Sequence, residues 1–168
     1  MSFIKIKPED IEKNTFEVIG NNWLLLTAGN MDSYNTMTVS WGGLGVLWKK
    51  NVATVYVRPQ RYTYEFMEKN DYFTLSAYPE TMHDKLALCG SKSGRDIDKV
   101  ASCGFTPKSG EAGGVYFDEA EFVLVCRKLY YNDFDPKHFL VPEIEDCYTN
   151  HDYHRMYIGE IVEALVKK

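Results

Sequence analysis

The amino-acid sequence predicts a mainly β domain, an antiparallel barrel with short peripheral helices. Several short apolar runs are rich in Val, Thr and aromatic residues and end at Gly or Pro, which is typical of strands. Two longer runs of this kind, at residues 120–131 and 156–166, are long enough to span a barrel. The helical patterns are short and lie between the strands. Because 168 residues suit one domain, we expect a single domain over residues 1–168.

The first half of the chain is predicted to supply three strands after an N-terminal arm at residues 1–14. One helical turn is expected within this arm, at residues 10–13, because Pro8 precedes it. The predicted strands are apolar or Thr-rich runs, at residues 23–29, 35–41 and 51–58, the last of them closed by Pro59.

Short helices and one further strand are predicted in the middle of the chain. Residues 63–70 form a helical pattern, with Thr63 as the expected N-cap and an apolar face at Phe66 and Met67. The other expected segments are a strand at 71–78, a helix at 81–88 capped by Thr81, a loop at 90–96, a helix at 97–102, a flexible link at 110–114 and a helix at 135–139 that begins with Pro136.

Charge and hydropathy exclude two classes of partner. The formal net charge is −5 and no run of Lys or Arg is longer than two, so a nucleic-acid partner is not expected. The N-terminus lacks an apolar segment of signal-peptide length, and the apolar runs are too short to span a membrane. We therefore expect a cytoplasmic protein without a membrane partner.

The four cysteines do not form a recognisable metal or redox motif. They are Cys89, Cys103, Cys126 and Cys147, and no C-x-x-C pair occurs among them. This spacing argues against a zinc ribbon and against a thioredoxin-type pair. We expect free thiols in a reducing compartment, with Cys126 as a small core residue within its strand.

The strand at residues 35–41 is unusually polar and ends at the glycine turn Gly42–Gly43. Its Asn, Thr and Ser side chains place hydrogen-bonding groups on both faces of the strand. A polar ligand lying along the strand could use these groups. The alternative is a half-buried strand whose Thr residues simply favour β structure.

Two further segments have the chemistry of an anion site. Arg61 precedes the helix predicted near Thr63, where free backbone N–H groups and a charge-assisted donor suit a monoester phosphate. Ser91, Ser93 and Lys99 could contact the same phosphate. The alternatives are an ordinary strand–turn–helix junction with a surface Arg, and a solvated loop. Neither a G-x-x-x-x-G-K motif nor a G-x-G-x-x-G after a strand is present.

These three segments, 35–43, 58–63 and 89–96, together resemble the FMN-binding split-barrel flavin reductases, including the flavoredoxin-like members. The resemblance covers roughly residues 14–166. It implies a Greek-key-like split barrel and a homodimer with FMN between the subunits. The aromatic share of 14% is compatible with a dimer interface, a flavin pocket or a β-rich core.

The resemblance implies a set of cofactor-binding residues. The strand would lie beside the isoalloxazine ring, with Trp41 either on the ring or in the core, and the other segments would hold the phosphate. The set comprises Asn35, Thr36, Met37, Thr38, Ser40, Trp41, Arg58, Arg61, Tyr62, Thr63, Cys89, Gly90, Ser91, Ser93 and Lys99.

One histidine is implied as catalytic. His154 precedes the Ile158–Gly159–Glu160 strand, as a histidine near the nicotinamide site does in these reductases. It would orient the nicotinamide or relay a proton near flavin N5, since imidazole titrates near neutral pH. A share of this role for His151 stays open. No third ligand is spaced to make a metal site of the two histidines, and no metal is expected.

The implied function is an NAD(P)H-dependent flavin reductase that passes a hydride from NADH or NADPH to FMN. Two alternatives remain. The first is a flavoredoxin-like FMN electron carrier that a redox protein partner reduces. The second is a non-redox module that binds flavin as a sensor or store.

Overall fold

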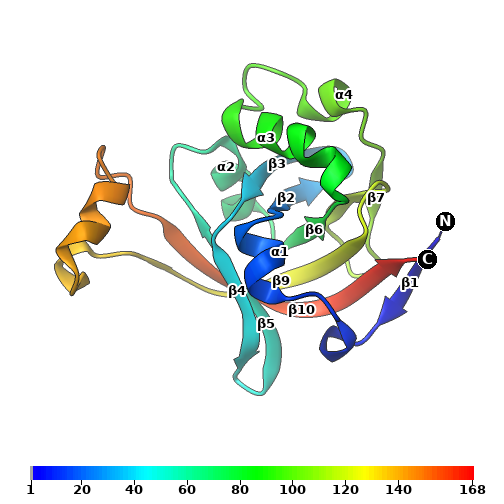
Figure 1. Cartoon of the computed structure of the whole chain (residues 1–168), viewed down its shortest axis with the longest axis horizontal. Helices are drawn as coiled ribbons and strands as arrows, with labels where there is room; N and C mark the ends of the chain where they lie inside the picture. Colours follow the sequence, from blue (N-terminus) through cyan, green and yellow to red (C-terminus); the bar gives the residue numbers. More distant parts are fainter. Residues whose placement is uncertain (1) are drawn as a thin grey trace.

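The computed structural model describes residues 2–168 and confirms the predicted mainly β, antiparallel fold (Figure 1). One sheet contains eight strands, and all its pairings are antiparallel. The strands are β1 (Phe3–Ile6), β2 (Leu24–Asn30), β3 (Ser33–Val39), β4 (Gly42–Leu47), β5 (Lys50–Val57), β6 (Tyr72–Ala77), β9 (Phe122–Asp133) and β10 (Arg155–Lys167). A separate hairpin joins β7 (Pro107–Ser109) to β8 (Val115–Phe117).

The sheet curls into a split barrel. Its main path runs β3-β2-β6-β9-β10-β5-β4, and β1 pairs with β10 beside that path. The two ends of the path, β3 and β4, are separated in the chain only by Ser40 and Trp41. The curled sheet therefore brings its two edges toward each other at these two residues, which mark the split.

Four α-helices decorate the described chain: α1 (Thr15–Gly20), α2 (Tyr62–Lys69), α3 (His83–Ser91) and α4 (Lys99–Cys103). Short 3₁₀ turns occur at Pro8–Asp10, Glu80–Met82, Pro136–His138 and Pro142–Cys147. Helix α3 packs against β3, and α2 packs against both β2 and β3. None of the helices between residues 2 and 168 combines the length and apolar content that crossing a membrane requires.

Two apolar cores explain the sequence pattern of the central strands. On β2, Leu24 and Leu26 point into the barrel, while Leu25 points to a second core beneath α3 and the β7–β8 hairpin. Strand β9 alternates in the same way. Both faces of these strands are thus covered, which is why their sequences are continuous apolar runs. Gly159 on β10 is also a packing residue, because a Cβ there would lie 2.6 Å from the Phe73 ring.

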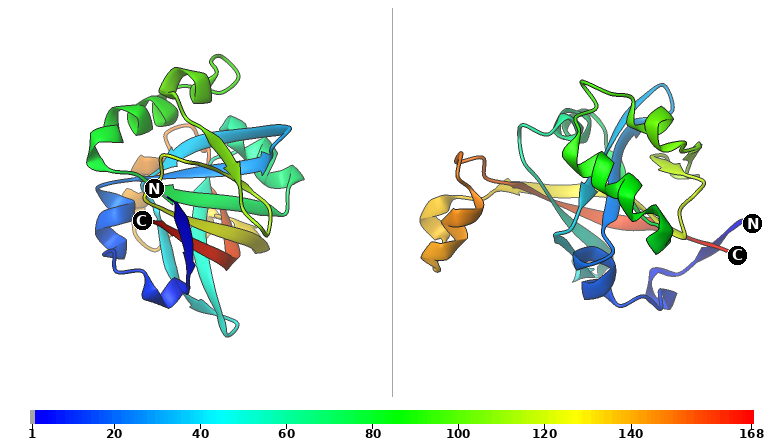
Figure 2. Two further views of the ribbon diagram at one scale, coloured as in Figure 1. Left: turned by 90° about the vertical axis from the view of Figure 1, so that its right-hand side faces the viewer. Right: turned by 45° about the horizontal axis from the view of Figure 1, so that its top comes forward.

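Strands β9 and β10 extend beyond the barrel and carry a projecting lobe, residues 134–154 (orange in Figure 1, and at the left of the right-hand view in Figure 2). Aromatic rings hold the lobe together: Phe139 stacks on Tyr148 with centroids 5.9 Å apart, and Tyr148 lies 5.0 Å from Tyr153. The two ends of the described chain pair at the opposite end of β10, where Ser2 N–H donates to the Lys168 carbonyl.

Several sequence-based expectations were wrong or incomplete. Strands β1, β4, β7 and β8 and helix α1 were not predicted. The turn expected at 10–13 is a 3₁₀ turn at Pro8–Asp10. Thr63 is not the N-cap of α2, because the helix starts one residue earlier and Arg61 is the cap. Thr81 caps no helix, since it lies inside the 3₁₀ turn before α3. The link at 110–114 is a hydrogen-bonded turn between β7 and β8.

Candidate functional site

The start of helix α2 forms one wall of a polar cavity. Strand β5 ends at Val57, and the backbone then turns through Arg58 and Gln60, with Arg61 N–H donating to the Arg58 carbonyl at 3.1 Å. The first-turn N–H groups of a helix have no partner within it. Thr63 stabilises this start, because its Oγ1 accepts a hydrogen bond of 2.8 Å from Asn35 Nδ2 on β3.

This cavity, which we call the cationic cavity, has a volume of about 460 Å³. Four cationic side chains and no carboxylate among the described residues line it, although the chain carries a net charge of −5. Its lining comprises Asn35, Met37, Arg58, Gln60, Arg61, Tyr62, Thr63, Ser91, Lys92, Ser93 and Lys99. Such a concentration of positive charge on an acidic protein indicates a site for an anion.

Two of the cations are held close to the protein rather than out in solvent. Arg61 donates from Nη1 to the Gly90 carbonyl at 2.6 Å. Burial, and then the neighbouring Arg58 charge, lower the pKa of Arg61. Lys99 is buried and donates from Nζ to the carbonyls of Thr36 and Cys89, at 2.8 and 2.7 Å. Burial lowers the pKa of Lys99 to about 8. A bound anion would therefore offset the free-energy cost of burying these two positive charges.

A second cavity continues from the first, and we call it the aromatic cavity. It has a volume of about 180 Å³ and shares Met37, Arg58 and Arg61 with the cationic cavity. Its other lining residues are Thr38, Val39, Ser40, Trp41, Tyr56 and His154. The two cavities form one trough, which runs from the start of α2 to the split of the barrel at Ser40 and Trp41.

His154 is the titratable group at the aromatic end of the trough. Its ring lies 5.2 Å from Trp41, and its Nδ1 lies 2.8 Å from the Tyr148 hydroxyl of the lobe. Burial first, and then the positive charge of Arg58, lower the pKa of His154 to about 4. The imidazole is therefore neutral near pH 7, which corrects the expectation that it titrates there.

Arg58 connects the trough to the lobe. Arg58 donates to Asp152 Oδ2 and to the Cys147 carbonyl, both at 2.8 Å, and its guanidinium lies 5.0 Å from the Tyr148 ring. Gln60 also donates to Asp152. Arg58 and Gln60 thus join the residues before α2 to the lobe.

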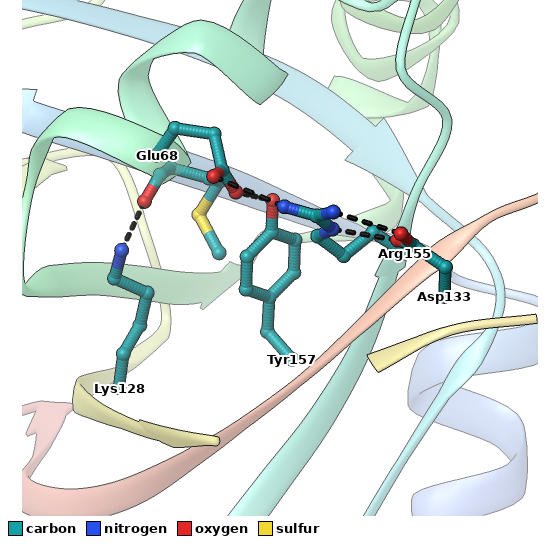
Figure 3. A network of polar contacts seen from close by, with 6 residues as sticks. Glu68, Lys128, Asp133, Arg155 and Tyr157 are labelled. Atoms are coloured by element: carbon teal, nitrogen blue, oxygen red, sulfur yellow. Dashed lines mark hydrogen bonds and ion pairs between the residues drawn. The ribbon is translucent and has the colours of Figure 1, made fainter. Parts of the chain in front are cut away.

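The far end of α2 is fixed by a polar network at the base of the lobe (Figure 3). Glu68 accepts from the Tyr157 hydroxyl at 2.5 Å and from Arg155 at 3.1 Å. Arg155 also makes a two-pronged ion pair with Asp133, at 2.6 and 2.8 Å. Lys128 donates to the Met67 carbonyl. Helix α2 is therefore anchored at both of its ends.

Most of the residues implied by the resemblance do come together, but not all side chains face the trough. Thr36 points into the core, where its Oγ1 pairs with Thr27 Oγ1 at 2.9 Å. The buried Cys89 thiol lies 3.8 Å from that of Cys103, away from the trough. Gly90 lines neither cavity and packs against Thr38, which lines the aromatic cavity and donates from its hydroxyl to the Leu86 carbonyl. Trp41 is about half exposed, which excludes its interpretation as a core residue.

The structure also adds residues that the sequence analysis did not identify. Gln60 and Lys92 line the cationic cavity, and Tyr56 lines the aromatic cavity. Tyr56 lies two positions before Arg58 and shares its face of the strand, so the two-residue strand period could have indicated it. By contrast, His151 lies in the lobe, exposed, and pairs with the Tyr153 hydroxyl at 3.1 Å rather than lining the trough.

Comparison with known proteins agrees with the family that the sequence resembles. A family model described as a flavin reductase like domain matches residues 18–168. No curated protein matches the sequence.

Solved structures share the fold of this chain. The flavoredoxin from Methanosarcina acetivorans is 23% identical, with a TM-score of 0.70 over 98% of this chain and 75% of that chain. The flavoredoxin of Desulfovibrio vulgaris (Miyazaki F) is 24% identical, with a TM-score of 0.68 over 87% of this chain and 69% of that chain. An NADH:FAD oxidoreductase from Streptomyces globisporus is 14% identical, with a TM-score of 0.64 over 87% of this chain and 74% of that chain.

Proposed function

This chain belongs to the flavin reductase-like family, and from that membership we propose that it is an FMN-dependent oxidoreductase that accepts hydride from NADH or NADPH. The observation that carries the proposal is the trough. One end has the charge that a phosphate monoester needs, and the other end has the aromatic lining that a planar ring needs.

The cationic cavity fits the phosphate of FMN. Arg61 and the first-turn N–H groups of α2 would donate to the phosphate oxygens, with Ser91 and Ser93 beside them. Lys99 lines the same cavity, but two of its three donors are already used by the Thr36 and Cys89 carbonyls. Lys99 would therefore contribute mainly charge, and it would also hold β3 against α3.

The aromatic cavity fits one end of the flavin ring. The backbone between Val39 and Trp41 lies at the split, where it is not covered by a neighbouring strand of the sheet path. Its polar groups would position the ring, and donors near a flavin tune its reactivity. Bound FMN would supply the two-electron redox chemistry of hydride transfer, while the residues of this chain would bind and orient it.

His154 would act as a neutral hydrogen-bonding group. If the Tyr148 hydroxyl donates to Nδ1, the proton of the imidazole lies on Nε2 and can be donated into the aromatic cavity. Its pKa of about 4 argues for orienting the nicotinamide amide or a flavin atom rather than for delivering a proton as an imidazolium.

We also propose that the protein is a homodimer with the trough near the interface. Large apolar side chains are exposed on the β4–β5 hairpin and on the lobe, including Trp48 (54% exposed) and Leu140 (93% exposed). Exposed apolar groups of this size on projecting elements are typical of surfaces that another protein covers.

The test of the function is anaerobic reduction of the FMN-loaded protein, followed by its visible spectrum. We expect FMN to bind stoichiometrically and to be bleached by NADH or NADPH in stopped-flow mixing. Slow bleaching by both nucleotides, together with fast bleaching by a reduced ferredoxin-type protein, would favour the electron carrier that the flavoredoxin neighbours suggest. An FMN that neither kind of donor reduces would contradict a redox function.

A further inference from the structure

We propose that a separate apolar pocket beside the trough binds a small, uncharged, planar aromatic molecule. The pocket lies between helix α1 and the start of β4 and has a volume of about 620 Å³. This volume is within the usual range of small-molecule sites, about 300–1,000 Å³. Only its place beside the flavin ring rests on the proposed function.

Aromatic side chains form the walls of the pocket. Phe16 and Ile19 of α1 face it from one side, and Trp41, Tyr56 and Phe134 line it from the other. Phe16 is 90% exposed and Trp41 is about half exposed, so these rings have open faces that a planar ligand could cover. Stacking on such faces stabilises planar ligands beyond the area that they bury.

The pocket lacks charge, and this determines which ligand it can take. Its lining includes no Asp, Glu, Lys, Arg or His among the described residues. A charged group moved here from water would lose its hydration without gaining a counter-charge. The adjoining trough is cationic, so an anionic ligand would bind there instead. The occupant of the pocket is therefore an uncharged molecule rather than a phosphorylated nucleotide.

The pocket shares a wall with the trough. Ser40, Trp41 and Tyr56 line both the apolar pocket and the aromatic cavity. Trp41 therefore separates a ligand of the pocket from the end of the trough that we assign to the flavin ring. This shared wall distinguishes the pocket from an isolated surface hollow.

Glycines keep the pocket open. A Cβ built on Gly20 or on Gly43 would meet no atom within 4 Å, and both residues line the pocket. Gly43 does not have a positive φ, so a larger residue there would fill the pocket without backbone strain. Gly45 offers a matched control, because it lies on the same face of β4, has the same free space, and is not part of the lining.

The test is equilibrium dialysis of the FMN-loaded protein with two probes that share one ring skeleton. N-phenyl-1-naphthylamine is uncharged, and 8-anilino-1-naphthalenesulfonate carries a sulfonate. We expect one bound naphthylamine per chain and at least about tenfold weaker binding of the sulfonate. We expect Gly43→Leu to weaken naphthylamine binding at least about fivefold and Gly45→Leu to change it less than about twofold.

Retained FMN binding and an unchanged circular dichroism spectrum show that Gly43→Leu is folded. Equal binding of both probes, or unchanged naphthylamine binding by Gly43→Leu, overturns the proposal. So does release of FMN by the naphthylamine, because the probe then occupies the trough. Loss of probe binding as the protein dimerises overturns it as well, since a second copy then covers the pocket. If FMN does not bind at all, the same dialysis on the flavin-free protein still tests the pocket.

Discussion

The two arginines of the trough differ in what balances their charge. Arg58 pairs with the Asp152 carboxylate at 2.8 Å, whereas Arg61 makes its hydrogen bond to a neutral carbonyl, that of Gly90. Burial and the neighbouring positive charge of Arg58 both disfavour the protonated form of Arg61 and lower its pKa. A bound anion would therefore stabilise the Arg61 charge more than the Arg58 charge. The main role of Arg58 is to hold the lobe in place.

Replacement of Arg61 by Ala should separate FMN from riboflavin. Loss of one charge-assisted contact costs roughly 1.5–3 kcal/mol, or about ten- to a hundredfold in affinity. We expect that loss for FMN and a much smaller loss for riboflavin, measured by titration of flavin fluorescence. Arg127→Ala is the control, because Arg127 is an exposed arginine that pairs with Glu160. An equal loss for both flavins would remove Arg61 from the phosphate site.

The neutral state of His154 should make stability depend on pH. Its folded pKa is about 4, below its ordinary value of 6.5, so between these values the unfolded chain binds a proton that the folded chain does not. Folding stability should therefore fall as the pH decreases from about 7 to 4, by at most about 3 kcal/mol from this residue. Above pH 7 the imidazole is neutral in both the folded and the unfolded state, so it does not make the unfolding free energy depend on pH.

Urea denaturation of the wild type and of His154→Gln, at several pH values, measures this contribution. Glutamine does not titrate, so the difference in unfolding free energy between the two proteins should change in favour of the variant as the pH falls. His151→Gln serves as the control, because His151 is exposed. If the unfolding free energies of wild type and His154→Gln changed with pH in the same way, His154 would not be held neutral in the folded protein.

The role of His154 in reduction is a separate prediction. We expect His154→Ala to bind FMN nearly as well as the wild type, but its bound FMN to be reduced by NADH about ten- to a thousandfold more slowly, because the nicotinamide would lose a group that orients it. His151→Ala should have little effect, since His151 does not line the trough. Single-turnover reduction of bound FMN measures this, beside melting curves of both variants. If the bound FMN of His154→Ala were reduced at the wild-type rate, His154 would have only a structural role.

At the scale of elements, α2 links the trough to the base of the lobe. Its first turn forms the wall of the cationic cavity, and Glu68 in its last turn joins the network of Tyr157 and Arg155 on β10 (Figure 3). Burial, together with the hydrogen bond to Glu68, raises the pKa of Tyr157. The hydroxyl therefore stays protonated and remains a donor to Glu68 at any ordinary pH.

Removal of this donor should destabilise the protein. Tyr157→Phe keeps the buried ring and deletes the hydroxyl, which leaves Glu68 without one of its partners. We expect a loss of about 1–3 kcal/mol in unfolding free energy, with an unchanged denaturant slope. Tyr130→Phe is the matched control, because Tyr130 is partly exposed. Equal midpoints for the two variants in urea would show that the Tyr157 hydroxyl contributes nothing to stability.

The elements that the sequence predicted are those with a strong local pattern. Strands β2, β5, β6, β9 and β10 are long apolar runs, and their predicted bounds are correct within one or two residues. Strand β4 was missed because three of its six residues are glycine, which disfavours strands. Helix α1 was missed although Asn14 caps it, accepting from Phe16 N–H at 3.0 Å, because six residues show little helical periodicity.

At the scale of the whole molecule, the sequence indicated which segments form the site but not which side chains face it. The segments at 35–41, 58–63 and 89–99 do meet around one trough. Whether Thr36 or Cys89 faces that trough depends on strand register and on helix rotation, which tertiary packing sets. The lobe was not predicted, because its polar and aromatic sequence has no repeating pattern and its shape depends on contacts with Arg58.

The projecting lobe leads to the prediction about assembly. Its exposed Leu140 and the exposed Trp48 of the β4–β5 hairpin do not pack into either core of the chain. A specific dimer typically buries upward of ~1,600 Å². Light scattering at low micromolar concentration should therefore give twice the chain mass of 19.4 kDa.

Two substitutions locate the interface. Leu140→Asp places a charge on the lobe and should shift the population toward monomer, because an unpaired charge is costly in a buried interface. Met31→Asp is the matched control, since Met31 is also an exposed apolar residue (48%) but lies in the β2–β3 turn. It should leave the dimer intact. If the site is completed by the partner, Leu140→Asp should also weaken FMN binding in proportion to the monomer fraction. A wild type that is monomeric and still binds FMN would contradict a flavin site between subunits, and the trough of one chain would then be sufficient.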